Sequence, residues 1–208
     1  MAFSDKNFKR LGDVIVAYSL IHQRISGLDK IQFATVSEYL TNEIQFVLDN
    51  ADYKISEETI CESLLYPILK EIWKAYVNEF TLWSHKSLVY DDTLKGVPDY
   101  IFSKRSKHGY IAFENPYIAV VEAKLDDFVG GWVQCALEMI AIQKINMQKE
   151  KPIYGIVTNG DFWEFGKLEN DLFTQYKEKI SISNLPQLMG VLDYILAECK
   201  RIYIDGEN

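Results

Sequence analysis

The fold is decided by one stretch, residues 97–128, which reads VPDYIFSKRSKHGYIAFENPYIAVVEAKLDDF. Its segments 99–104 and 117–124 are rich in Ile, Val, Tyr and Phe, which favours β-strands, and a loop joins them. When two neighbouring strands pair antiparallel, the start of the first lies beside the end of the second. We therefore expect Asp99, which opens the first segment, to lie next to Glu122 and Lys124, which close the second.

These three side chains have the chemistry of a metal site beside a phosphate. Glu122 and Lys124 share one face of their strand, because side chains two positions apart point the same way, roughly 6.6 Å apart along it. Two carboxylates without adjacent His or Cys ligands are hard oxygen ligands, which suit Mg²⁺ or Mn²⁺. An ion held there would polarise a phosphoryl oxygen and acidify a bound water, and a lysine beside it would stabilise the developing charge.

The pattern is more specific than an acid-x-Lys triplet alone. Residues 52–54 and 122–124 both form such a triplet, but only the second follows an apolar strand. Only the second is also preceded by a strand that opens with Pro98-Asp99, the one Pro-Asp pair in the chain. The alternative is a strand that simply ends in solvated charges.

The residues on either side predict a mixed fold. Residues 56–78 are expected to form a helix that Ser56 caps and Pro67 kinks. Residues 158–161, TNGD, are typical of a hairpin turn. Helix-like spacing also covers 13–23 and 36–50. The other expected elements are strands at 81–90, 99–104, 117–124, 153–159 and 162–169, and helices at 129–148 and 185–202.

Pro98-Asp99 followed by Glu122-x-Lys124, on an α-β-β-β-α-β order of elements, resembles the PD-(D/E)xK nuclease superfamily, and among its members the nuclease domains of type I restriction enzymes. The resemblance covers about residues 56–166. It implies an α/β (α+β) fold of the restriction-endonuclease-like kind, with a central mixed sheet flanked by helices. It also implies a Mg²⁺- or Mn²⁺-dependent nuclease in which Asp99 and Glu122 bind the metal and Lys124 is the catalytic lysine. We expect this domain at 52–208, after an N-terminal helical extension at 1–51.

The resemblance implies further site residues on two helices. In many members the helix after the third strand carries a Gln in a Q-x-x-x-E pattern, which Gln134 and Glu138 match on one helix face. A polar rim of an amphipathic helix is the alternative. The first helix often supplies a metal-binding Glu. Glu57 falls within the apolar arc of that helix, whereas Glu58 and Glu62 lie at its margin and match the family spacing best. Glu58 is therefore favoured as the third metal ligand, with Glu62 as the second candidate, and ordinary first-turn acids are the alternative.

Charge limits how the chain can contact nucleic acid. The formal net charge is −8, which weighs against a protein that coats nucleic acid through bulk charge. Residues 104–108, KRSKH, offer a local basic patch, although a solvated turn is the simpler interpretation. The early apolar run 14–21 is too short to span a membrane, so we expect a cytoplasmic protein with no membrane partner.

The cysteines and histidines are scattered. No C-x-x-C pair is present, so buried free thiols are expected rather than a structural zinc site. The histidines match no catalytic spacing, and His85 is interpreted as an edge or core residue. The residues concerned are Cys61, Cys135, Cys199, His22, His85 and His108.

Three functional hypotheses follow. The first is a metal-dependent nuclease acting on nucleic acid, with DNA as the expected partner, either alone or as a homodimer or larger oligomer. The second is a catalytically silent protein on the same fold, which binds nucleic acid or a protein partner as a regulatory module. The third is a component of a larger restriction or transposition system, in which a partner supplies DNA recognition.

Overall fold

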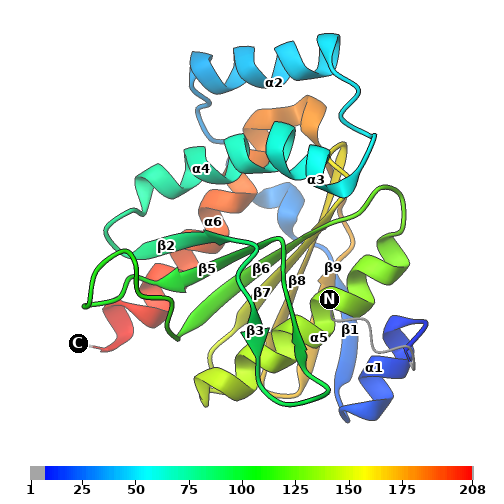
Figure 1. Ribbon diagram of the computed structural model, residues 1–208, viewed down its shortest axis with the longest axis vertical. Helices are drawn as coiled ribbons and strands as arrows, with labels where there is room; N and C mark the ends of the chain where they lie inside the picture. The colour runs from blue at the N-terminus through cyan, green and yellow to red at the C-terminus, as the bar shows by residue number, and fades with distance from the viewer. Residues whose placement is uncertain (1–7, 208) are drawn as a thin grey trace.

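A mixed β-sheet forms the centre of the computed structural model, which describes residues 8–207 (Figure 1). The strand order is β1-β9-β8-β7-β6-β5-β2, and β10 pairs with β8. The pairs β6–β7 and β1–β9 are parallel, and the other adjacent pairs are antiparallel. The strands are β1 (Ile21–Ile25), β2 (Phe80–Ser84), β5 (Tyr100–Lys104), β6 (Tyr117–Ala123), β7 (Ile153–Thr158), β8 (Phe162–Glu169), β9 (Leu172–Tyr176) and β10 (Ile180–Ser181).

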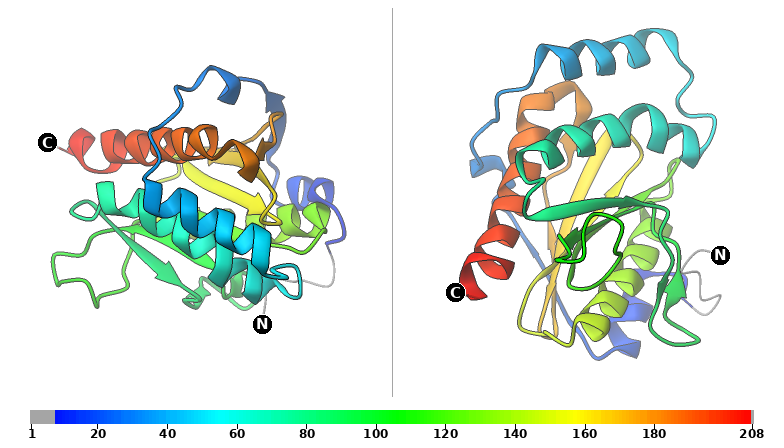
Figure 2. Two further views of the ribbon diagram at one scale, coloured as in Figure 1. Left: turned by 90° about the horizontal axis from the view of Figure 1, so that it is seen from above. Right: turned by 60° about the vertical axis from the view of Figure 1, so that its left-hand side comes forward.

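Helices cover both faces of this sheet, as Figure 1 and Figure 2 show. One face packs against α3, α4 and α6, with α2 lying outside α4, and the other face packs against α5 and α1. A two-stranded ribbon of β3 and β4 also lies against α5. These elements are α1 (Leu11–Ala17), α2 (Glu38–Asn50), α3 (Glu57–Ile60), α4 (Tyr66–Ala75), α5 (Phe128–Asn146), α6 (Leu185–Tyr203), β3 (Leu88–Val89) and β4 (Lys95–Gly96). Short 3₁₀ turns occur at Leu28–Lys30, Ile182–Asn184 and Asp205–Glu207.

The helix expected from residue 56 is present, and its cap is confirmed. The Ser56 hydroxyl accepts a hydrogen bond from the backbone N–H of Thr59 at 3.2 Å. The disruption expected at Pro67 takes the form of a π-helical segment, Cys61–Leu65, which separates α3 from α4. Proline lacks a backbone N–H, so the regular hydrogen-bond ladder cannot continue through it. π-Helical segments of this kind often occur at functional sites.

Most of the expected elements beyond residue 80 are found within two residues of their expected ends. β8 has the expected bounds, and the hairpin before it turns through Gly160 at φ 86°. The strand predicted over 81–90 is wrong in its second half. β2 ends at Ser84, and His85 adopts a left-handed conformation with φ 48°, which turns the chain out of the sheet before β3.

The N-terminal residues differ from the purely helical segment that their spacing predicted. The helix expected over 13–23 ends at Ala17, and residues 21–25 form β1, which pairs in parallel with β9 at the edge of the sheet. The second expected helix is confirmed as α2, and the Ser37 hydroxyl caps it by accepting a hydrogen bond from Leu40 N–H at 3.1 Å. The first residues 1–7 lie outside the described part, and the division of the chain at residue 52 stays a prediction.

Most residues of α5 are buried, because other elements cover the helix on nearly all sides. Its inner side packs on β6 and β7, and its outer side meets α1 and the β3–β4 ribbon. This enclosure matters for function because α5 carries Gln134 and Glu138 into the interior. Within residues 8–207, none of the helices combines the length and the apolar character needed to cross a membrane.

Candidate active site

Asp99 and Glu122 are brought together by the pairing of β5 with β6. The strands are antiparallel with Tyr100 opposite Val121, so the residues that follow at this end of the sheet are Asp99 and Glu122. The backbone N–H of Ala123 donates to Oδ2 of Asp99 at 2.7 Å. The predicted antiparallel juxtaposition is therefore confirmed.

Lys124 completes this group from the end of β6. Its Nζ lies 2.7 Å from Oε1 of Glu122 and 3.2 Å from Oε2 of Glu57, which reaches over from α3. Burial by itself would lower the pKa of the Lys124 ammonium, but the charges and hydrogen bonds of Glu122 and Glu57 outweigh burial and raise it. Lys124 is therefore a fixed positive charge between two carboxylates.

Glu122 has the most unusual environment in the group. Its side chain is only 2% exposed, and its Oε2 atom is buried without a hydrogen-bond partner among the described residues. Burial raises the pKa of Glu122 to about 8; the nearby charge of Asp99 acts in the same direction, and Lys124 partly opposes both. Burial also raises the pKa of Asp99, against the hydrogen bond from Ala123. Binding of a cation or a proton to Oε2 of Glu122 would therefore stabilise this buried carboxylate.

The first-helix acids are arranged differently from the sequence expectation. Glu57, rather than the favoured Glu58 or the second candidate Glu62, contacts Lys124. Glu58 is exposed, and a hydrogen bond to its own backbone and one to the Ser56 hydroxyl lower its pKa. Glu62 is also exposed. The signal that identifies Glu57 is its place within the apolar arc, because the arc that faces the sheet also faces the acids at the end of the sheet.

Gln134 and Glu138 lie behind Glu122 on α5. Nε2 of Gln134 donates to Oε1 of Glu138 at 3.3 Å, which confirms that the two side chains share a face. Glu138 is completely buried, and its Oε2, like that of Glu122, accepts no hydrogen bond from the described residues. Burial, followed by the charge of Glu122, raises the pKa of Glu138 well above its usual value. Burial therefore favours the protonated form of Glu138.

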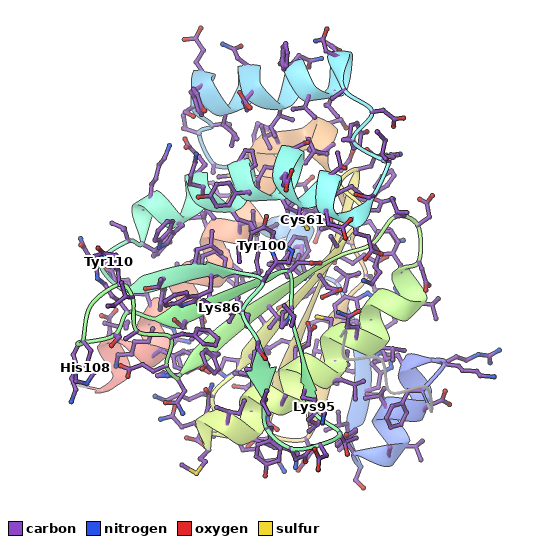
Figure 3. All side chains as sticks on the ribbon, in the orientation of Figure 1. Cys61, Lys86, Lys95, Tyr100, His108 and Tyr110 are labelled. Atoms are coloured by element: carbon purple, nitrogen blue, oxygen red, sulfur yellow. The ribbon has the colours of Figure 1, made fainter. Side chains whose placement is uncertain are left out.

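Two residues at the site were not expected from the sequence. Cys61 begins the π-helical segment, and its carbonyl accepts a hydrogen bond from the Tyr100 hydroxyl at 3.0 Å. Figure 3 shows Cys61 and Tyr100 close together beneath α3 and α4. His85 follows β2, and its Nε2 lies 3.5 Å from Oδ1 of Asp99. The register of β2 on β5 sets this contact, because Ser84 pairs with Tyr100.

The basic segment 104–108 lies away from this group. It begins at the far end of β5 from Asp99, so a strand of five residues, roughly 17 Å long, separates the two. Figure 3 shows His108 and Tyr110 on an outlying loop, far from Cys61. Residues 104–108 are therefore too far from Asp99 to contact a phosphate held beside it.

Three carboxylates lie close to Lys124 at this end of the sheet. Glu122 and Glu57 both contact Lys124, and Asp99 lies beside Glu122 on the paired strand, although these three acids do not bring one oxygen each within 4.8 Å of one another. The buried Oε2 of Glu122 has no hydrogen-bond partner among the described residues and could accept a cation. Mg²⁺ and Mn²⁺ are bound by few carboxylates and keep water or phosphate as their other ligands. Neither protein-family models nor curated proteins give a match to this sequence.

Proposed function

We propose that this chain is a divalent-metal-dependent nuclease of the PD-(D/E)xK type, which hydrolyses phosphodiester bonds in DNA. The observation that carries the proposal is the convergence of Asp99, Glu122 and Lys124 at one end of the sheet. The buried Oε2 of Glu122 supports a metal at this place. A buried carboxylate oxygen without a hydrogen-bond donor destabilises the fold unless a cation or a proton binds to it.

The order of elements supports the proposal. The helix of residues 57–75 is followed by β2, β5 and β6, then by α5 and β7. This is the α-β-β-β-α-β order expected of the nuclease core, with the small β3–β4 ribbon inserted between its first two strands. The first three strands are antiparallel and β7 is parallel to β6, which gives a mixed sheet.

Each side chain then has a defined task. Asp99, Glu122 and Glu57 would hold Mg²⁺ or Mn²⁺, which supplies Lewis-acid activation of the phosphate and of a bound water. Lys124 holds Oε1 of Glu122, so the other oxygen of that carboxylate is left for the metal. The same ammonium provides positive charge beside the reacting phosphate. Gln134 and Glu138, which are hydrogen-bonded to each other, lie behind the Glu122 carboxylate on α5.

The test is cleavage of single-stranded, double-stranded and branched DNA with Mg²⁺ or Mn²⁺. We expect cleavage that chelation abolishes and that Lys124→Gln reduces at least a hundredfold, while the circular dichroism spectrum stays that of the wild type. The matched control is Lys54→Gln, because Lys54 also ends an acid-x-Lys triplet and pairs with Asp161 on the surface. If none of these substrates is cleaved and calorimetry detects no Mn²⁺ binding, the proposal is contradicted.

A second candidate is a catalytically silent protein on this fold that binds a partner. The net charge of −8 and the distance of the basic segment from the acids favour it, because both reduce attraction for a phosphate backbone at the site. Partner binding that Asp99→Asn leaves unchanged, in a protein that binds no Mn²⁺, would select this candidate over the nuclease.

A further inference from the structure

A second set of metal-ligating side chains adjoins the acids. Cys61, His85 and Asp99 each offer one ligand atom, and these atoms all lie within 4.8 Å of one another. They come from three places in the sequence: the start of the π-helical segment, the residue after β2 and the residue before β5. Thiolate, imidazole and carboxylate are the ligands that Zn²⁺ takes in proteins, whereas Mg²⁺ takes oxygen alone.

His85 is held in place for such a role. Its left-handed backbone, with φ 48°, is uncommon for a residue other than glycine, and its N–H donates to the carbonyl of Asp99 at 2.9 Å. Its ring Nδ1 lies 2.7 Å from the hydroxyl of Ser84, and its Nε2 faces Asp99 at 3.5 Å. Metal-binding histidines are commonly oriented in this way, with one ring nitrogen on a protein partner and the other toward the ion.

The distances between the three ligand atoms are close to those in an occupied zinc site. In a tetrahedral zinc site, bonds of about 2.0–2.3 Å place neighbouring ligand atoms about 3.3–3.7 Å apart. The His85–Asp99 contact already has this spacing, and the remaining separations, at most 4.8 Å, need a shift of roughly 1 Å, which the exposed ring of His85 can make. Cys61 is buried at 1% exposure and His85 is exposed, so the group runs from the packed interior to the surface.

We propose that Cys61, His85 and Asp99 bind Zn²⁺, with water as the fourth ligand. On binding, the S–H bond of Cys61 is replaced by an S–Zn bond, and the proton leaves to solvent. Asp99 also belongs to the acid group that would hold Mg²⁺, so the two ions compete for one carboxylate. The consequence, which rests on the proposed function, is that Zn²⁺ inhibits Mg²⁺-dependent cleavage.

Co²⁺ is the probe, because it takes zinc positions and a Co²⁺–thiolate bond gives a near-ultraviolet absorption band. We expect titration of the full chain with Co²⁺ to produce this band and one equivalent of Zn²⁺ to remove it. Cys61→Ser should lose the band. Cys135→Ser and Cys199→Ser should keep it, because those two buried cysteines lie outside the group. A wild-type protein without the band, or a Cys61→Ser variant that retains it, overturns the proposal.

His85→Ala provides a second test that does not disturb the core. His85 is exposed, so this variant should fold even if Cys61→Ser does not, and its Co²⁺ affinity should fall at least tenfold. His22→Ala is the matched control, because His22 lies on the edge strand β1 and should leave the affinity unchanged. Unchanged affinity in His85→Ala contradicts the proposal. The absorption band needs no cleavage, so the zinc site and the nuclease can each fail without the other.

Discussion

The backbone N–H of Ala123 donates a 2.7 Å hydrogen bond to Oδ2 of Asp99, so the carboxylate that opens β5 also fastens the end of β6. Asp99 therefore has two separable tasks. One is structural, because Ala123 is fully buried and its N–H needs an acceptor. The other is electrostatic, because the Asp99 charge lies beside Glu122 and Lys124.

Two substitutions of Asp99 should separate these tasks. Asp99→Asn keeps an acceptor for the N–H of Ala123, so its free energy of unfolding in urea should stay within about 1 kcal/mol of the wild-type value. Its affinity for Mn²⁺, measured by calorimetry, should fall at least tenfold. Asp99→Ala leaves the N–H unpaired and should lose about 1–3 kcal/mol of stability as well. Equal stability of the two variants would show that the hydrogen bond to Ala123 is not what Asp99 contributes to the fold.

Glu57 should be the helix acid on which the site depends. Its contact with Lys124 predicts that Glu57→Gln lowers Mn²⁺ affinity and cleavage at least tenfold, because it removes a carboxylate from the site and a partner from Lys124. Glu58→Gln and Glu62→Gln are matched controls on the same helix and should change both quantities less than twofold. If Glu58→Gln instead loses more Mn²⁺ affinity and cleavage than Glu57→Gln, Glu58 is the metal ligand, as the sequence favoured.

The acids on the strands could be predicted because their geometry is local. Residues 99–104 and 117–124 are neighbours in sequence, and antiparallel pairing alone determines which ends meet. Glu57 was missed because Glu58 and Glu62 matched the family spacing better, although Glu57 lies on the apolar arc and that arc faces the sheet that ends at the site. His85 was missed because no periodicity predicts a left-handed residue that ends a strand.

The edge strand β1 could not be predicted for a different reason. All five of its residues are exposed, so the alternation of buried and exposed side chains that identifies a strand is missing. Its partner β9 lies some 150 residues further along the chain, and such long-range parallel pairing leaves no local signal. Residues 13–23 therefore appeared as one helix, whereas the chain turns at Ser19, which has φ 54°.

The stability of the metal-free protein should depend on Glu122 between pH 5 and 8. Its folded-state pKa of about 8 exceeds the value near 4.3 expected in the unfolded chain, so the folded state binds the proton more tightly. The stabilisation is complete below the unfolded pKa and is lost as the pH rises through about 8. Glu122→Gln stays neutral, so its free energy of unfolding should rise relative to the wild type by at most about 1.4 kcal/mol per pH unit in this window.

Urea denaturation in EDTA at pH 5, 6.5 and 8 would measure this difference. Glu150→Gln, at an exposed position, is the control, and its difference from the wild type should be the same at all three pH values. A Glu122→Gln difference that is also independent of pH would mean that Glu122 stays ionised in the folded protein, held so by Lys124.

Gly131, in the first turn of α5, should be needed for the position of Lys124. A Cβ on this residue would lie 2.6 Å from Cγ1 of Val157 and 3.0 Å from Cγ of Lys124. Val157 is fully buried and β-branched, so it has little freedom to move, and the first turn of α5 and the Lys124 side chain must both shift to relieve the two contacts. We expect Gly131→Ala to cost roughly 1–3 kcal/mol of stability by overpacking.

The displacement of Lys124 should also appear in catalysis. If Lys124 acts beside the reacting phosphate, Gly131→Ala should lower kcat at least tenfold while Mn²⁺ affinity changes less, because the carboxylates stay in place. Gly12→Ala in α1 is the matched control: its Cβ meets nothing within 4 Å, so it should keep full activity and gain up to about 1 kcal/mol from helix propensity. A Gly131→Ala protein that is destabilised but cleaves at the wild-type rate would show that turnover does not depend on this placement of Lys124.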